Sequence, residues 1–75
     1  MSEERILDLR GLKCPLPVMK TRKAMARLAP GARLVVETTD PMAAIDIPHF
    51  CNEAGHRLLA RDLEAGVGRF VIEKG

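Results

Sequence analysis

The chain has 75 residues, a length that predicts a single domain over residues 1–75 with no room for a second. A domain of this size has a thin core, so we expect no enclosed cofactor. The 12 basic and 10 acidic residues give a net charge of +2, which is well below the charge density of a phosphate-binding surface. With two phenylalanines and no other aromatic residue, few rings are available to stack on bases, so we expect no stable nucleic-acid binding.

Two further features bear on the compartment. The sequence has no apolar run of membrane-spanning length, and residues 1–5 lack the basic and apolar regions of a signal peptide. Both observations predict a cytoplasmic protein without membrane contact. The two cysteines, Cys14 and Cys51, are then expected as reduced thiols, each either buried in the core or available for chemistry.

The first half of the chain predicts a strand followed by a helix. Residues 5–9 are typical of a short strand, which Gly11 interrupts. A helix is expected from Cys14 to about Ala29, with Pro15 at its first position and Cys14 as its N-cap. Pro17 still lies in the first turn, where a missing amide is tolerated. The apolar stripe of this helix comprises Val18, Thr21, Met25 and Leu28.

The middle of the chain predicts a second strand and a second helix. Residues 32–38 alternate between an apolar face and a face expected to be largely solvated, which carries Val35 with Arg33 and Glu37. Asp40 followed by Pro41 is typical of a helix start. Pro48 is expected to interrupt this helix, and Asp46 to cap the piece that follows. The inward positions are Ile47, Phe50, Cys51 and Ala54.

Two strands, residues 57–63 and 67–73, are expected at the end of the chain, joined by a three-residue loop at residues 64–66. The predicted order is therefore β-α-β-α-β-β. Because one face of the strands carries charges, we expect both helices on the other face. The fold class predicted is α/β, a two-layer sandwich with a mixed four-stranded sheet.

Cys14 is the strongest candidate for chemistry. A sulfur at a helix N-terminus, next to Lys13 and close to Arg10, is favoured as a thiolate, although the two prolines remove amide donors and leave the net effect open. Neither His49 nor His56 is near Cys14 in the sequence, which argues against a self-sufficient cysteine hydrolase. The alternative is that Cys14 only fills space at a helix start.

The stretch from Leu7 to Val18, which contains Arg10-Gly11-Leu12-Lys13-Cys14-Pro15-Leu16-Pro17, resembles the signature of the TusA/SirA family of sulfur-carrier proteins. The resemblance extends through Asp40-Pro41, Asp46-Ile47-Pro48 and Phe50-Cys51 to the last two strands. It implies that Cys14 accepts sulfane sulfur, as a persulfide, from a cysteine desulfurase or a rhodanese-type donor. A downstream acceptor protein would then serve tRNA thiolation, molybdenum-cofactor metabolism or sulfur oxidation. The supporting motif residues would be Arg10, Gly11, Lys13, Pro15 and Pro17.

Other residues are open to two interpretations. Cys51 lies on an inward stripe and is better explained as core than as a second reactive thiol. The spacing of His49, Cys51 and His56 matches no zinc pattern, so no metal is expected. Basic residues that follow Cys14 on the same helix are either a solvated face or a docking surface for a partner. These residues are Lys20, Lys23 and Arg27.

Three functions from different classes remain open. The first is a persulfide carrier, a monomer that meets its donor and acceptor transiently and borrows catalysis from them. The second is a regulatory or binding module that acts through its basic helix without sulfur chemistry. The third is a thiol–disulfide module, which would need Cys51 or an external thiol because Cys-x-x-Cys is absent.

Overall fold

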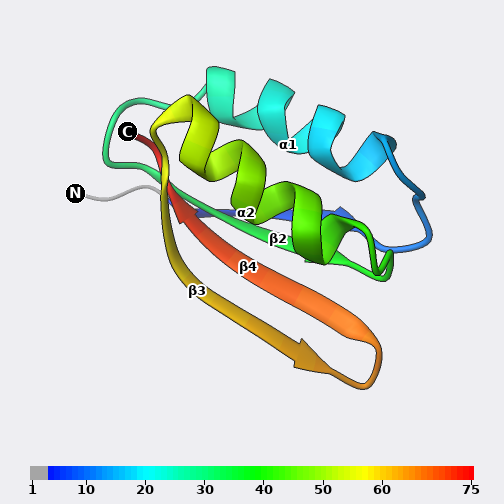
Figure 1. The fold of residues 1–75 in the computed structure, drawn as a ribbon. Helices are drawn as coiled ribbons and strands as arrows, with labels where there is room; N and C mark the ends of the chain where they lie inside the picture. Colours follow the sequence, from blue (N-terminus) through cyan, green and yellow to red (C-terminus); the bar gives the residue numbers. More distant parts are fainter. Residues whose placement is uncertain (1–3) are drawn as a thin grey trace.

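The computed structural model describes residues 4–75, and its two helices lie side by side on one face of a four-stranded sheet (Figure 1). Residues 1–3, part of the segment that argued against a signal peptide, lie outside the described range. The elements are β1 (Glu4–Leu9), α1 (Leu16–Ala26), β2 (Arg33–Thr38), α2 (Ala43–Ala54), β3 (Arg57–Glu64) and β4 (Val67–Glu73).

The sheet is mixed, with strand order β1-β2-β4-β3. β1 pairs with β2 in parallel, whereas the pairs β2–β4 and β3–β4 are antiparallel. The predicted element order and the two-layer α/β sandwich are therefore confirmed. Figure 1 also shows that the β3–β4 hairpin extends beyond the helical layer, so its turn is not covered by either helix.

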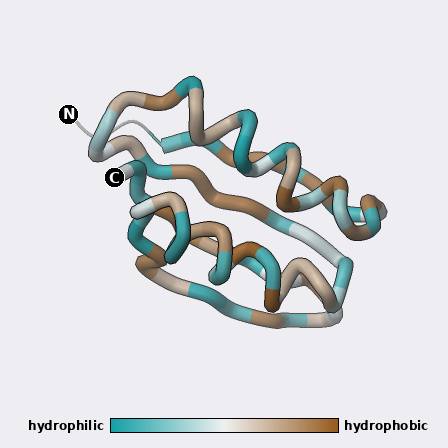
Figure 2. Tube along the Cα trace, turned by 45° about the horizontal axis from the view of Figure 1, so that its top comes forward, coloured by the Kyte–Doolittle hydropathy of each residue, from teal (hydrophilic) through white to brown (hydrophobic). Residues whose placement is uncertain are grey.

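The core lies between the helices and the sheet, along the two inner strands, of which β2 is one. Leu34 and Val36 of this strand are buried at 2% and 0% exposure, as their alternation predicted. The run of apolar residues along this strand is visible in Figure 2. Val35 was expected on the solvated face, but it is also buried, at 1% exposure. It lies in the middle of the sheet between Ile6 and Val71, its register partners on either side, which explains the burial.

Helix α1 begins later than predicted, at Leu16, with Pro15 as its N-cap. Cys14 therefore lies just outside the helix, and the expectation that it caps α1 was wrong. Pro17 does lie within the first turn, where its missing amide is harmless. The helix ends at Ala26 rather than near Ala29.

Helix α2 is continuous from Ala43 to Ala54, so the expected interruption at Pro48 was wrong. A proline here removes the hydrogen bond to the carbonyl four residues earlier. That residue, Ala44, is exposed, so its carbonyl can be hydrated. The N-cap is Met42 rather than Asp40, and Asp46 lies in the first turn instead of starting a second piece. Gly55 ends the helix at φ 78°, as predicted.

The turn between β3 and β4 is shorter than expected. Glu64 still pairs with Val67, so the loop consists of Ala65 and Gly66 rather than of three residues. Both have positive φ, 53° and 79°, as in the two-residue turns that match the twist of a hairpin. Within residues 4–75, neither helix has the length and apolar character needed to cross a membrane.

Candidate functional site

The loop between β1 and α1, residues 10–15, carries Cys14 at one end of the sheet. The amide of Leu12 donates to the carbonyl of Leu9 at 3.2 Å, and the amide of Leu16 donates to the carbonyl of Lys13 at 2.9 Å. Gly11 has φ 85°, a conformation that glycine adopts without strain, and its amide donates to Oγ1 of Thr39 at 2.9 Å. These contacts fix the loop against the segment that follows β2.

Two acidic residues hold Cys14. Its amide donates to Oδ2 of Asp40 at 2.7 Å, and its Sγ donates to Oδ2 of Asp46 at 3.4 Å. Asp40 follows β2, and Asp46 lies in the first turn of α2. The backbone and the side chain of one exposed cysteine are thus held by two separate points of the β2–α2 segment.

These acidic neighbours oppose ionisation of the sulfur. The hydrogen bond to Asp46 raises the pKa of Cys14 above its ordinary value, and desolvation and the negative charges of Asp46 and Asp40 act in the same direction. The cations that the sequence placed near the sulfur do not reverse this effect. Arg10 pairs with Asp8 through Nε–Oδ1 at 2.8 Å and Nη2–Oδ2 at 3.0 Å, and this pairing lowers the pKa of Asp8 to about 2.

Cys14 lies in a shallow, open pocket of about 300 Å³ rather than in an enclosed cavity. Lys13 also lines this pocket and supplies its one cationic side chain. A second hollow of about 450 Å³ begins at the same Thr39–Pro41 segment and runs toward the β3–β4 hairpin. The thiol is therefore accessible to another macromolecule. The residues that line its pocket are Gly11, Leu12, Lys13, Cys14, Thr39, Asp40 and Pro41.

The other motif residues shape the helix that follows. The Cys14–Pro15 peptide bond is cis, and Pro17 is buried beneath the first turn of α1. The carbonyl of Pro17 accepts a hydrogen bond from Oγ1 of Thr21 at 2.8 Å, and Thr21 is fully buried. Pro17 and Thr21 therefore fix the start of α1 against the core, next to the loop that carries Cys14.

Three basic side chains, two on α1 and one at its C-cap, form a separate exposed surface. Lys20, Lys23 and Arg27 line a shallow hollow of about 260 Å³ together with Leu7 and Ala24. This hollow shares no lining residue with the Cys14 pocket, although residues of the β1–α1 unit line both. We refer to Lys20, Lys23 and Arg27 as the basic α1 surface.

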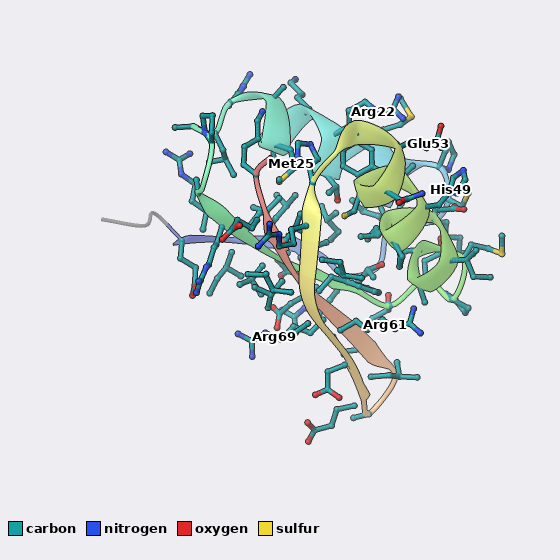
Figure 3. The ribbon with its side chains drawn as sticks, turned by 60° about the vertical axis from the view of Figure 1, so that its left-hand side comes forward. Arg22, Met25, His49, Glu53, Arg61 and Arg69 are labelled. Carbon is teal, nitrogen blue, oxygen red and sulfur yellow. The ribbon has the colours of Figure 1, made fainter. Side chains whose placement is uncertain are left out.

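Cys51 does not join the site. It is 1% exposed in the core, and both cysteines are free thiols. His49 pairs instead with Glu53 at 2.7 Å on the outer side of α2 (Figure 3), and Nδ1 of His56 accepts the amide of Gly75 at 3.1 Å. Within residues 4–75, no three His, Cys, Asp or Glu side chains come together in an arrangement suited to a metal ion.

The sequence did not identify Asp40 and Asp46 as neighbours of the sulfur, because both were interpreted as helix caps. Asp40 does accept the amide of Met42 through Oδ1 at 3.2 Å, so its role in the turn before α2 is real. Asp46 makes no capping hydrogen bond. Because Asp46 lies in the first turn and does not cap the helix, its carboxylate is available to another part of the fold, here the thiol of Cys14.

The arrangement defines a class of protein, a small two-layer α/β domain that presents one exposed thiol on the loop before its first helix. The model of the family described as "Sulfurtransferase TusA" matches residues 5–74, and the chain belongs to this family. The fold is similar to the crystal structure of a SirA-like protein from Desulfitobacterium hafniense, with a TM-score of 0.85 and 23% identity over 95% of this chain and 97% of that one. Membership in a sulfurtransferase family indicates a role in sulfur transfer.

Proposed function

We propose that this protein is a sulfur carrier that holds a persulfide on Cys14 and passes its outer sulfur to an acceptor protein. The observation that carries the proposal is that the one exposed thiol belongs to the Cys14-Pro15-Leu16-Pro17 motif in a member of a sulfurtransferase family. An open pocket suits a group that must be reached by one protein and then by another.

The chemistry needs only one exchange at sulfur in each direction. The sulfur of Cys14 attacks the outer sulfur of a donor persulfide, which forms an S–S bond on Cys14 and breaks the S–S bond of the donor. The donor cysteine leaves with the bonding electron pair and takes up the proton that the Cys14 thiol has lost. Delivery repeats this exchange with Cys14 as the leaving thiol, so no external oxidant or reductant is consumed.

The donor class proposed is a cysteine desulfurase or a rhodanese-type protein, and the acceptor is a second protein that contacts the same sulfur. Acceptors in tRNA thiolation, molybdenum-cofactor metabolism or sulfur oxidation fit this proposal. The basic α1 surface provides a place for an acidic partner to dock beside the loop that carries the thiol. The carrier would work in the cytoplasm as a monomer and bind each partner transiently.

Intact mass spectrometry tests this function. The protein is incubated with a cysteine desulfurase and cysteine, and in parallel with thiosulfate and a rhodanese. The expected result is a reductant-sensitive gain of one sulfur atom that maps to Cys14. It should be lost in Cys14→Ser and kept in Cys51→Ala, the control for a buried cysteine.

Two results would contradict the proposal. Sulfur found only on Cys51 would show that Cys14 is not the thiol that carries the persulfide. No gain from either donor, while Cys14 still reacts with an alkylating reagent, would favour the regulatory module that acts through the basic α1 surface.

A further inference from the structure

The contact between Asp46 and Cys14 has no structural role in α2 itself. Asp46 lies 32 residues from Cys14 in the sequence, and α2 has Met42 as its N-cap with no side-chain cap. Within residues 4–75, Sγ of Cys14 is the sole hydrogen-bond partner of the Asp46 carboxylate, which also forms no ion pair. A half-buried carboxylate aimed at the one exposed thiol therefore acts on that thiol.

We propose that Asp46 is a positioning residue that keeps Cys14 as a protonated thiol in the free protein, and that a cationic side chain of a partner frees the sulfur for transfer. This inference rests on the sulfur-carrier function proposed above, because it names what controls the same sulfur and what kind of partner group it meets.

The charges around the sulfur support the first half of the proposal. Asp46 approaches from α2 and Asp40 from the loop before it, and both disfavour negative charge on Sγ. Two cations lie on the same loop as Cys14: Lys13 lines the pocket of the thiol, whereas Arg10 is already bound to Asp8. The S–H group has an acceptor at 3.4 Å, and a thiolate in its place would face a carboxylate.

A protonated resting state is useful to an exposed carrier. The thiolate is the form that attacks disulfides and is oxidised, so an exposed thiolate would react with molecules other than its partners. A thiol held by Asp46 is much less reactive until a partner arrives. A lysine or arginine placed beside Asp46 offsets the carboxylate charge and makes the thiolate favourable where a donor persulfide is at hand. The proton then ends on the donor's leaving cysteine, as the exchange requires.

The first arm of the test measures the rate at which iodoacetamide, a neutral reagent, alkylates Cys14 as a function of pH. The proteins are the wild type, Asp46→Asn and the control Asp62→Asn, all with Cys51→Ala. Asp62 is an exposed acid on β3 that lines no part of the Cys14 pocket. Asp62→Asn changes the net charge of the protein by the same amount as Asp46→Asn, but away from the thiol. The profile of Asp46→Asn should move to lower pH, with about a tenfold faster rate at neutral pH for each unit by which the pKa falls.

The second arm measures whether a cation favours the reaction of Cys14, and its wild-type comparison needs no variant. It compares the rates at which Cys14 exchanges with cystamine, a cationic disulfide, and with dithiodipropionate, an anionic disulfide of similar size. Each rate is divided by the rate for mercaptoethanol, a free neutral thiol, because the two reagents also differ in their leaving thiols. The corrected preference for the cationic reagent should be several-fold in the wild type, and it should shrink in Asp46→Asn. A wild-type preference no larger than that of mercaptoethanol would overturn the role of a partner cation.

A profile for Asp46→Asn that coincides with those of the wild type and Asp62→Asn would overturn the assignment of Asp46. Sulfur loading is measured separately on the wild type, so the two proposals can fail independently. If the profile shifts but neither donor loads Cys14, the effect of Asp46 on the thiol stands and the carrier function fails. If sulfur loading succeeds and the profile of Asp46→Asn does not shift, the carrier function stands and the role of Asp46 fails.

Discussion

The amide of Cys14 donates a hydrogen bond of 2.7 Å to Asp40, a residue 26 positions further along the chain. The other oxygen of the same carboxylate accepts the amide of Met42 at 3.2 Å, just before α2 begins. One side chain therefore joins the loop that carries the thiol to the start of the second helix. The position of the sulfur depends on this carboxylate as well as on its own loop.

Asp40→Ala should lower the free energy of unfolding by about 1–2 kcal/mol, because two backbone amides lose a charged acceptor and both lie where water can partly replace it. Urea denaturation measures the change. Asp40→Asn keeps one carbonyl acceptor and should lose less. Equal midpoints for the wild type and Asp40→Ala would show that the hydrogen bond to Cys14 contributes nothing to stability.

Gly11→Ala should destabilise the fold by about 1 kcal/mol. The reason is backbone conformation, since φ is 85° and no atom lies within 4 Å of the position that a Cβ would occupy. Gly11→Asn should be less harmful, because asparagine tolerates positive φ better than alanine does. Thermal or urea unfolding of the two variants checks this order, and an alanine variant as stable as the wild type would contradict it.

Ile47→Ala should cost about 2–5 kcal/mol, because Ile47 is fully buried next to Asp46 and leaves a cavity when truncated. Ile47→Val should cost about 0.5–1.5 kcal/mol. Ile45 on the same helix is 64% exposed, so Ile45→Ala is the matched control and should change stability by less than about 0.5 kcal/mol. Similar losses for Ile45→Ala and Ile47→Ala in urea would be evidence against this packing of α2.

His56 should make the protein less stable in mild acid. Burial lowers the pKa of His56 below its ordinary 6.5, and the nearby charge of Lys74 adds to the effect. The unfolded chain then binds a proton more readily than the folded one. The stability from neutral His56 is therefore complete above pH 6.5 and is lost as the pH falls through the lower folded value. Urea midpoints at pH 7 and pH 5 should differ less in His56→Gln than in the wild type.

Lys74 offers a separate check on His56. Its Nζ donates to the carbonyl of Met25 near the end of α1 at 2.6 Å, and its charge disfavours a proton on the imidazole. Lys74→Met should therefore raise the pKa of His56, measured by NMR titration of the ring protons. An unchanged titration curve would exclude the contribution of Lys74.

Charge reversal on the basic α1 surface should slow sulfur loading without removing the thiol. Lys20→Glu combined with Lys23→Glu should reduce the loading rate several-fold at low salt, and the difference should shrink at high salt as the charges are screened. Arg57→Glu, on the β3 edge of the sheet, is the control and should load like the wild type. If neither the substitutions nor the salt concentration changes the loading rate, this surface does not dock the donor.

The sequence predicted most of the fold because its periodicities are local. Leu34 and Val36 occupy alternate positions of β2, Thr21 and Met25 repeat at helical spacing, and all four are buried as expected. The interruption at Pro48 was predicted from a local rule, but packing of Ile47, Phe50 and Cys51 keeps the helix continuous across the missing hydrogen bond. Val35 was misplaced because burial at the centre of a sheet depends on the neighbouring strands.

The candidate site was predictable only in part. The Cys14-Pro15-Leu16-Pro17 motif identified the thiol, and the local sequence indicated cations as its neighbours. In the structure Arg10 is bound to Asp8, and the side chains that contact Cys14 come from 26 and 32 residues away. Contacts at such separations follow from the pairing of β1 with β2 and from the placement of α2, which no local pattern contains.

The two bonds from Cys14 to the β2–α2 segment couple the ionisation of the thiol to the placement of the second helix. The backbone of Cys14 belongs to one βα unit and both acidic partners belong to the other, so a movement that separates the units also takes the carboxylate of Asp46 away from Sγ. Because Cys14 is exposed, it is alkylated without any opening, and such a movement changes the pH dependence of alkylation rather than access to the sulfur. A substitution elsewhere in α2 that displaces Asp46 should therefore shift the pH profile of Cys14, even where global unfolding is unchanged.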